Sequence, residues 1–260
     1  MPKFFVKENQ VNNNQIHIIG EDVNHIKNVL RMKIGDTFKV CNEESSENYL
    51  VEIQTFIKEE IICNIIEKIE NSTESNVKVH IYQGLPKADK MELIIQKSVE
   101  LGVNAITPIE MKNCVVKLDG KDKIKKIDRW QKISEVAAKQ CGRNIIPKIC
   151  SIKNISEICR EFEQYNLVIL CYENEKNTYL KNVLEEIKKS KIINKDNTKI
   201  AVIIGPEGGI DVSEVDIMKQ NGAKVVSLGS RILRTETVSL NVLSIIMYEL
   251  EANNWSKINN

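Results

Sequence analysis

The sequence predicts an α/β protein of two domains, a small β-rich domain followed by a domain with a mainly parallel sheet. The length of 260 residues suits two modest domains better than one. The first 70 residues are patterned as short strands, whereas strands and helices alternate from Val77 onward. Such alternation is typical of a parallel sheet with helices on both faces. A polar linker at residues 71–76 separates the two patterns, so we place the domains at residues 1–72 and 73–260.

Five short strands and one helix account for the first domain. Brief apolar segments predict strands at residues 4–6, 16–18, 37–41, 49–57 and 61–69. Residues 21–32 predict a helix with Asp22 as its N-cap. Gly35 and Asp36 mark a turn. Several strands with a single helix indicate a small barrel.

In the second domain, five strands alternate with five helices. The expected strands span residues 77–82, 105–109, 167–171, 200–204 and 225–228, and the expected helices span residues 89–101, 123–140, 177–189, 212–221 and 238–250. Gly102 is suited to end the first helix in the left-handed conformation, and Asp211 with Glu214 suits a capping box. His80 lies inside an apolar strand, so we expect it in the core or at its rim rather than as a ligand.

Composition excludes several classes of protein. Apolar residues make up 42% of the chain, which excludes wholesale disorder. No apolar run approaches the roughly 18 residues of a membrane span, and the segment MPKFFVKENQ lacks the apolar region of a secretory signal. Seven cysteines without a C-x-x-C pair, and only three histidines, assemble no zinc set. We therefore expect a cytoplasmic protein with reduced thiols, no metal and no membrane association.

Charge is distributed unevenly along the chain. The net charge is +1, yet residues 1–73 hold 8 basic and 12 acidic side chains, whereas residues 87–143 hold 13 basic and 8 acidic ones. A small net charge argues against nucleic-acid binding through a basic tail. The local surplus at residues 87–143 is nevertheless available as a track for RNA, so a neutral total does not exclude nucleic acid.

Two loops that follow strands carry the candidate chemistry, since ligands of open parallel sheets bind beyond the carboxyl ends of strands. The first, GPEGG at residues 205–209, has three glycines ahead of a helix N-terminus. It matches neither a P-loop nor a dinucleotide motif, and a tight structural turn explains it as well as a ligand loop does. The second, LGSRILRTET at residues 228–237, places Arg231 and Arg234 beside an apolar helix. There Thr235 and Glu236 either cap that helix or belong to a site.

Further motifs accompany these loops in order over nearly the whole chain. They are HIKNVLR (25–31) with the following Gly35-Asp36, KME (90–92), IQKSVELGV (95–103), RWQKI (129–133) and QCGR (140–143). Together with IIGPEGGI (203–210) and LGSRILRTET, they resemble the RsmE-type ribosomal RNA uridine N3-methyltransferases of the trefoil-knotted SPOUT superfamily. The departures are small: Val238 stands where alanine is expected, and Asn113 replaces a small or basic residue.

That resemblance implies a PUA-like β-barrel at residues 1–72 and a SPOUT domain with a deep trefoil knot at residues 73–260. It implies a homodimer with the last helix at the interface. The implied cofactor is S-adenosylmethionine, held largely by backbone groups of three loops. The implied cofactor-binding residues are Leu170, Tyr172, Glu173, Ile204, Gly205, Glu207, Gly208, Gly209, Leu228, Gly229, Leu233, Arg234, Thr235 and Thr237.

The implied reaction is methylation of N3 of a specific uridine in small-subunit (16S) ribosomal RNA, with the assembled 30S subunit as the expected substrate. Because N3 loses a proton, we expect Arg234 to stabilise negative charge on the ring and Glu236 to accept the proton or orient the base. The alternative is that Glu236 only caps the helix. The expected RNA contacts are Arg31, Lys90, Lys117, Arg129 and Arg143.

Three alternatives stay open on the sequence. They are another SPOUT enzyme acting on a different RNA site, a non-catalytic RNA-binding assembly factor, and a nucleotide-dependent metabolic enzyme. The missing phosphate and dinucleotide motifs disfavour the third. Binding of S-adenosylmethionine separates the SPOUT enzymes from the assembly factor.

Overall fold

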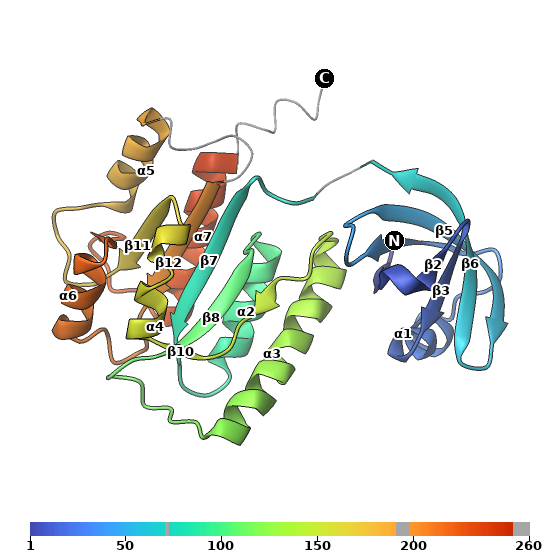
Figure 1. The fold of residues 1–260 in the computed structure, drawn as a ribbon, viewed down its shortest axis with the longest axis horizontal. Helices are drawn as coiled ribbons and strands as arrows, with labels where there is room; N and C mark the ends of the chain where they lie inside the picture. The colour runs from blue at the N-terminus through green and yellow to red at the C-terminus, as the bar shows by residue number, and fades with distance from the viewer. Residues whose placement is uncertain (71–72, 191–197, 252–260) are drawn as a thin grey trace. The chain divides into compact units, whose positions relative to one another are not determined.

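The computed structural model describes residues 1–70, 73–190 and 198–251 (Figure 1). The chain divides into two compact units. The first consists of Met1–Glu74 together with Ala138–Ile146, and the second of Ser75–Ala137 together with Pro147–Asn260. The first segment ends close to the expected boundary. Residues 138–146 also belong to the first unit, although the sequence pattern assigned them to the second domain.

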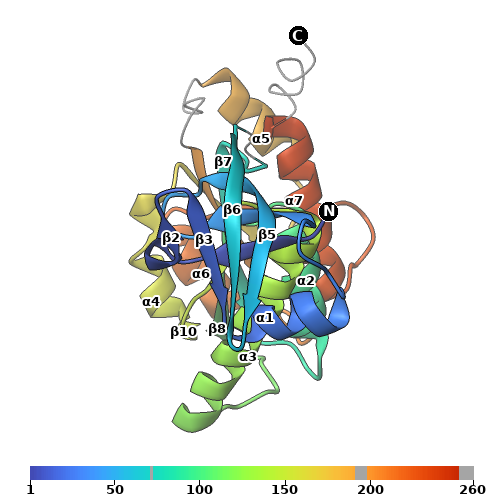
Figure 2. The same ribbon diagram turned by 90° about the vertical axis from the view of Figure 1, so that its right-hand side faces the viewer.

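The first unit is built on one six-stranded sheet. Its strands are β1 (Lys3–Val6), β2 (Val11–Asn12), β3 (Gln15–Ile19), β4 (Thr37–Asn42), β5 (Asn48–Ile57) and β6 (Glu60–Ile69). They lie in the order β1-β4-β5-β6-β3-β2, antiparallel except for the parallel pair of β1 and β4, and Figure 2 shows β3, β6 and β5 side by side. The five expected strands are confirmed. Because β1 and β2 end the described sheet, it is an open half-barrel.

The expected helix of this unit is shorter and differently capped. Helix α1 covers Glu21–Asn24 and is followed by a π-helical turn, His25–Val29. Gly20 holds the N-cap position without a side-chain hydrogen bond, so the prediction of Asp22 as the N-cap is wrong. Asp22 instead pairs with Lys139, whose Nζ lies 2.9 Å from its Oδ1. A partner so distant in the sequence leaves no local pattern.

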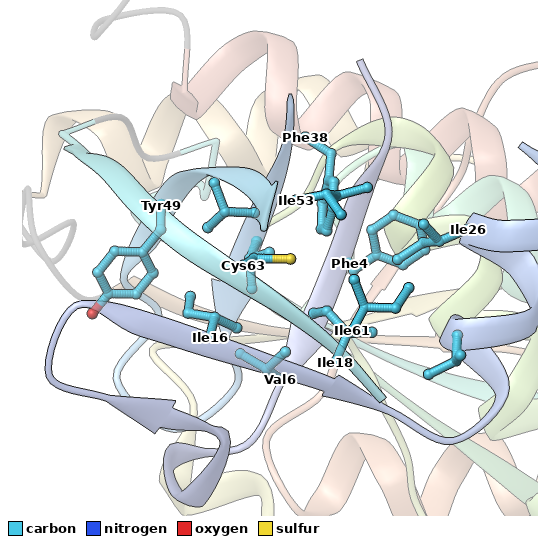
Figure 3. Close-up of a cluster of buried hydrophobic side chains, with 13 residues drawn as sticks. Phe4, Val6, Ile16, Ile18, Ile26, Phe38, Tyr49, Ile53, Ile61 and Cys63 are labelled. Carbon is cyan, nitrogen blue, oxygen red and sulfur yellow. The ribbon is translucent and has the colours of Figure 1, made fainter. Parts of the chain in front are cut away.

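Apolar side chains of the first unit form one cluster on the sheet. The rings of Phe4 and Phe38 meet edge to face with centroids 5.2 Å apart, and both residues are almost fully buried. Figure 3 shows Ile26 of the helical segment and Tyr49 of β5 at opposite ends of this cluster. Each fully buried side chain of this kind stabilises the fold by about 1.5–3 kcal/mol. The apolar residues whose alternation predicted the strands are thus the residues whose side chains fill the core.

The second unit contains a seven-stranded parallel sheet. Its strands are β7 (Val77–Gly84), β8 (Ala105–Glu110), β9 (Lys148–Ile149), β10 (Lys153–Asn154), β11 (Leu167–Cys171), β12 (Thr198–Ile204) and β13 (Lys224–Val226). The order is β10-β8-β7-β12-β11-β13, and β9 also pairs with β8. The five expected strands are confirmed. Strands β9 and β10 have two residues each, too few for a recognisable pattern.

Helices connect these strands. They are α2 (Lys90–Glu100), α3 (Gly120–Cys141), α4 (Ile155–Cys159), α5 (Leu180–Lys189), α6 (Val212–Gln220) and α7 (Thr235–Glu251). From the edge strand β13 the chain returns in α7 to pack on α2 and β7 (Figure 1). This return agrees with the knotted SPOUT arrangement that the resemblance implies. Helix α7 begins three residues earlier than the expected helix, so Thr235, Glu236 and Thr237 lie in its first turn and Arg234 directly precedes it.

The predicted helix ends are confirmed in part. Gly102, with φ of +94°, ends α2 in the left-handed conformation. Asp211 caps α6 by accepting a hydrogen bond from the Ser213 N–H at 3.1 Å. The predicted role of Glu214 in a capping box is wrong. Its Oε1 accepts a hydrogen bond from the Lys112 N–H at 2.9 Å rather than from the backbone N–H of Asp211.

A buried polar cluster surrounds His80 on β7. Its ring nitrogens lie 2.6 Å from the Tyr165 hydroxyl and 2.8 Å from the Thr107 hydroxyl, and its ring stacks on Tyr82 at 4.4 Å. The Tyr82 hydroxyl donates to Glu161 at 2.7 Å. Burial lowers the pKa of His80 to about 4, so the ring is neutral at pH 7 and belongs to the core as expected.

We expect the free energy of unfolding to fall as the pH drops from 6.5 to about 4. Within that window the unfolded histidine takes up a proton and the folded one does not, so acid favours the unfolded chain by up to about 3 kcal/mol. Urea unfolding at a series of pH values measures the slope. The variant His80→Gln does not titrate and should lose this part of the slope, while Glu161 and its ion-pair partner Lys153 stay in place. An unchanged slope contradicts the assignment to His80.

Candidate active site

The carboxyl ends of three neighbouring strands meet at one edge of the parallel sheet. Strand β11 lies between β12 and β13, with Cys171 opposite Ile204 on one side and Val226 on the other. Because the three strands are parallel, the loops that follow them converge. They enclose a cavity of about 470 Å³, within the range of roughly 300–1,000 Å³ that is typical of small-molecule sites.

Most of the implied cofactor-binding residues line this cavity. They are Tyr172, Glu173, Ile204, Gly205, Glu207, Gly209, Leu228, Gly229, Leu233, Arg234 and Thr235. Three others do not line it: Leu170 is buried within β11, Gly208 packs against Asn113, and Thr237 is exposed on α7. The cavity also takes in Lys90, Cys171, Pro206, Ser227, Ser230, Arg231, Ile232 and Val238. Cys171 and Ser227 gave no signal in the sequence, because a strand end does not distinguish a cavity wall from the core.

Two glycines let the walls of the cavity approach one another. A Cβ on Gly209 would lie 2.6 Å from Oε1 of Glu173, and its φ of +71° is strained for other residues. A Cβ on Gly84, at the end of β7, would lie 2.7 Å from the Pro206 ring. The glycine-rich loop is therefore packed tightly as well as open to a ligand. The sequence indicated Gly209 but gave no reason to single out Gly84.

The Thr235 hydroxyl ties the start of α7 to the glycine-rich loop. It donates to the Gly205 carbonyl at 2.7 Å and accepts from Nε2 of Gln83 at 2.8 Å. Oε1 of Gln83 in turn accepts from the Ser239 hydroxyl at 2.8 Å, and both of these side chains are fully buried. Of the two alternatives for Thr235, these contacts favour a place in the site over a helix cap, since the hydroxyl joins groups that are distant in the sequence.

Charged side chains gather at the rim of this junction. Nζ of Lys90 lies 2.9 Å from Glu207 and 3.3 Å from Glu236. The expected RNA contact Lys90 therefore lies inside the candidate site. Glu236 does not itself line the cavity, and it reaches the cavity wall through Lys90. Arg231 and Arg234 line the cavity and are exposed to solvent.

The other expected RNA contacts are not among the residues that line this cavity. Arg31 and Lys117 are exposed, and Arg31 has a φ of +54°. Arg129 is 60% exposed and pairs with Glu92 at 2.7 Å. Arg143 is only 8% exposed and forms an ion pair with Glu74 inside the first unit. A surface track through Arg143 is thus contradicted, because its guanidinium is buried and bound to a carboxylate.

Cys171 lines the cavity with a buried thiol. Burial raises the pKa of the Cys171 thiol to about 12, so it stays protonated and is a poor nucleophile. The described residues contain no group of three or more histidine, cysteine, aspartate or glutamate side chains able to hold a metal ion. Across the described ranges, no helix has both the length and the apolarity to cross a membrane.

Comparison with known proteins places this cavity in a family. A family model described as an RNA methyltransferase domain matches residues 73–247, and one described as an RNA methyltransferase PUA domain matches residues 18–66. The chain belongs to the RNA methyltransferase family. The whole cavity of this RNA methyltransferase lies within the first match.

Named relatives of this RNA methyltransferase are similar over almost their full length. The Ribosomal RNA small subunit methyltransferase E of Bacillus subtilis is 36% identical over 234 residues, covering 90% of each chain. The protein of that name from Mesomycoplasma hyopneumoniae is 34% identical over 244 residues, covering 94% of this chain and 98% of the relative. The Neisseria gonorrhoeae protein of that name, solved bound to S-adenosyl methionine, gives a TM-score of 0.82 at 27% identity, covering 95% of this chain and 97% of that one.

We expect Thr235→Val to destabilise this RNA methyltransferase by about 1–3 kcal/mol, because the Gly205 carbonyl and the Gln83 amide lose their shared partner. Chemical unfolding with circular dichroism measures the change. Thr237→Val on the same helix is the matched control, since Thr237 is exposed and should change stability by less than about 0.5 kcal/mol. If the two substitutions lower the free energy of unfolding equally, the buried Thr235 hydroxyl stabilises the fold no more than an exposed hydroxyl does.

Proposed function

We propose that this RNA methyltransferase transfers a methyl group from S-adenosylmethionine to N3 of a specific uridine in small-subunit (16S) ribosomal RNA. The observation that carries the proposal is the cavity at the ends of β11, β12 and β13, lined by three loops. The names of the relatives support the ribosomal substrate. The resemblance of GPEGG and LRTET supports the uridine N3 target. We further propose that it acts in the cytoplasm on the assembled 30S subunit, and the seven free cysteines support a reducing compartment.

The residues around the cavity suit S-adenosylmethionine. Glycines in two of the lining loops leave main-chain groups accessible to a polar ligand edge, as the missing Cβ of Gly209 illustrates. Ile204 and Leu228 supply apolar wall, and Glu173 with Glu207 supplies negative charge, which favours a cationic sulfonium or amino group. When bound, S-adenosylmethionine supplies the activated methyl group.

Two residues of the Arg-Thr-Glu-Thr run are proposed to act on the uridine base. Arg234 lines the cavity, where its guanidinium stabilises negative charge that develops on the ring oxygens. Glu236 lies in the first turn of α7, held by Lys90, and accepts the proton that N3 must lose. Methyl transfer requires N3 of the uridine to be aligned with the methyl group. Loops that the Thr235 hydroxyl holds in place are suited to keep that alignment.

RNA contacts and a homodimer complete the proposal. Exposed cations at Arg31, Lys117 and Arg129 suit the phosphate backbone. A homodimer through α7 and the loop before it is supported by apolar side chains left in solvent, since Tyr248 on α7 is 76% exposed and Ile232 in that loop is 87% exposed. Sedimentation velocity tests the dimer, and a purely monomeric chain at micromolar concentration would contradict it.

Mass mapping of the product tests the proposed reaction. Purified protein is incubated with S-adenosylmethionine and either 30S subunits or free small-subunit RNA that lacks the modification. The expected product is a single uridine carrying one methyl group at N3. Calorimetry with S-adenosylmethionine provides a second readout: absence of binding would favour a non-catalytic assembly factor, and a methyl group on another atom would overturn the N3 assignment.

Arg234→Ala and Glu236→Gln should each lower kcat by about 10²-fold or more, on the scale at which positioned acids and bases contribute roughly 10²–10⁴-fold. The physical reason is the loss of charge stabilisation in the first variant and of the proton acceptor in the second. Steady-state kinetics with saturating RNA measures the effect. A loss of less than about tenfold would remove that residue from its proposed role. Arg160→Ala, an exposed site outside the cavity, is the control.

Arg31→Gln should weaken RNA binding and lower the slope of log affinity against log salt by about one, as expected for a lost phosphate contact. Filter binding at several salt concentrations measures both quantities. The matched control is Lys58→Gln, an exposed cation in the same unit outside the motif, which should leave them unchanged. If Arg31→Gln behaves like the control, the first unit binds RNA through other residues.

A further inference from the structure

Lys90 joins three separate elements at the wall of the cavity. It is the first residue of α2, and its Nζ lies 2.9 Å from Oε1 of Glu207 in the loop after β12. The same Nζ lies 3.3 Å from Oε2 of Glu236 in the first turn of α7. A lysine that serves an RNA phosphate needs its charge free. The charge of Lys90 is instead shared between two carboxylates within the site.

The two carboxylates differ in their other partners. The Lys87 N–H donates to both oxygens of Glu207, at 3.1 and 3.2 Å. Burial opposes ionisation of Glu207, but the hydrogen bonds from Lys90 and from the backbone outweigh it and hold its pKa below the ordinary value. Oε2 of Glu236 is buried, and it faces Nζ of Lys90 at 3.3 Å. Glu207 is thus held as an anion by the Lys87 N–H as well as by Lys90, whereas the carboxylate of Glu236 is held by Lys90.

The cluster contains one more carboxylate than ammonium. One ammonium faces two carboxylates, so the group of three carries one excess negative charge. Protonation of one carboxylate makes the cluster neutral. The other titratable groups that line the cavity are Cys171, Tyr172, Glu173, Arg231 and Arg234. Among the described residues, the ion pair of Glu236 is with Lys90.

We infer that Lys90 is a positioning residue that holds the ionised Glu236 carboxylate at the cavity for removal of the substrate proton, an inference that rests on the proposed function. As the N3–H bond of the uridine breaks, the proton moves to the Glu236 carboxylate and the electron pair stays on the nitrogen for the new bond to carbon. Lys90 then keeps Glu207 as its counter-ion. Both carboxylates face the ammonium before the transfer, and Glu207 still faces it afterwards.

Kinetics of three variants test this role. Lys90→Met should lower kcat about tenfold or more with little change in KM for RNA, and Lys90→Arg, which keeps the cation, should restore most of the rate. In Lys90→Met the acid limb of kcat should move to higher pH, because loss of a nearby cation favours the protonated carboxyl. Lys97→Met on the same helix is the control, since Lys97 pairs with Glu100 at 2.8 Å, and it should leave rate and profile unchanged.

A double-mutant cycle separates action through Glu236 from an independent effect. In the Glu236→Gln background, Lys90→Met should lower kcat by less than about twofold, because both substitutions remove the same function. An unmoved acid limb, full additivity, or a rise in KM for RNA with kcat unchanged would each overturn the inference. If Lys90→Met does not fold, Lys90→Gln replaces it in the same cycle. Mass mapping of the wild-type product tests the proposed function separately. If the wild-type protein methylates N3 but the losses in kcat of the two variants are additive, only the role of Lys90 is overturned.

Discussion

The Thr235 hydroxyl is the contact on which the candidate site depends. It binds the carbonyl of Gly205 and the amide of Gln83, so one oxygen holds together the end of β7, the loop after β12 and the first turn of α7. All of these atoms are largely withdrawn from water, where an unmade hydrogen bond costs about 1–3 kcal/mol. Because the alternative is costly, these three segments are held in one arrangement, and the part of the cavity wall at Gly205 and Thr235 is preorganised.

Electrostatics at the rim follow from the same geometry. Once Thr235 fixes the start of α7, Glu236 is brought to Lys90, and the glycine-rich loop brings Glu207 to the other side of the same ammonium. Because two carboxylates face one ammonium, this cluster carries one excess negative charge and attracts positively charged groups. A cationic cofactor and a departing proton are both species that such a cluster favours.

Several side chains whose local pattern was correct took up partners that are far away in the sequence. Asp22 and Glu214 occupy positions suited to helix capping, yet they bind Lys139 and the Lys112 N–H. Arg143 follows a helix end at which solvent exposure is usual, yet it is buried against Glu74. The common cause is that a charged or hydrogen-bonding group near a buried surface must find a partner wherever the fold supplies one.

The sequence by itself determined the change from a β-rich to an α/β pattern, five strands and five helices of the second unit, and two of the loops that line the cavity. It could do so because apolar periodicity and glycine spacing are local properties of the chain. Strands β9 and β10 and helix α4 were too short to be predicted. The sequence also determined the family, through motifs that span most of its length. Only the tertiary structure decided that Lys90 lies in the site, that Gly84 must lack a Cβ and that Cys171 forms part of the wall. Those facts depend on the order β7-β12-β11-β13. Parallel pairing between distant strands leaves no mark on the residues beside it, so only the folded sheet reveals which strand ends meet.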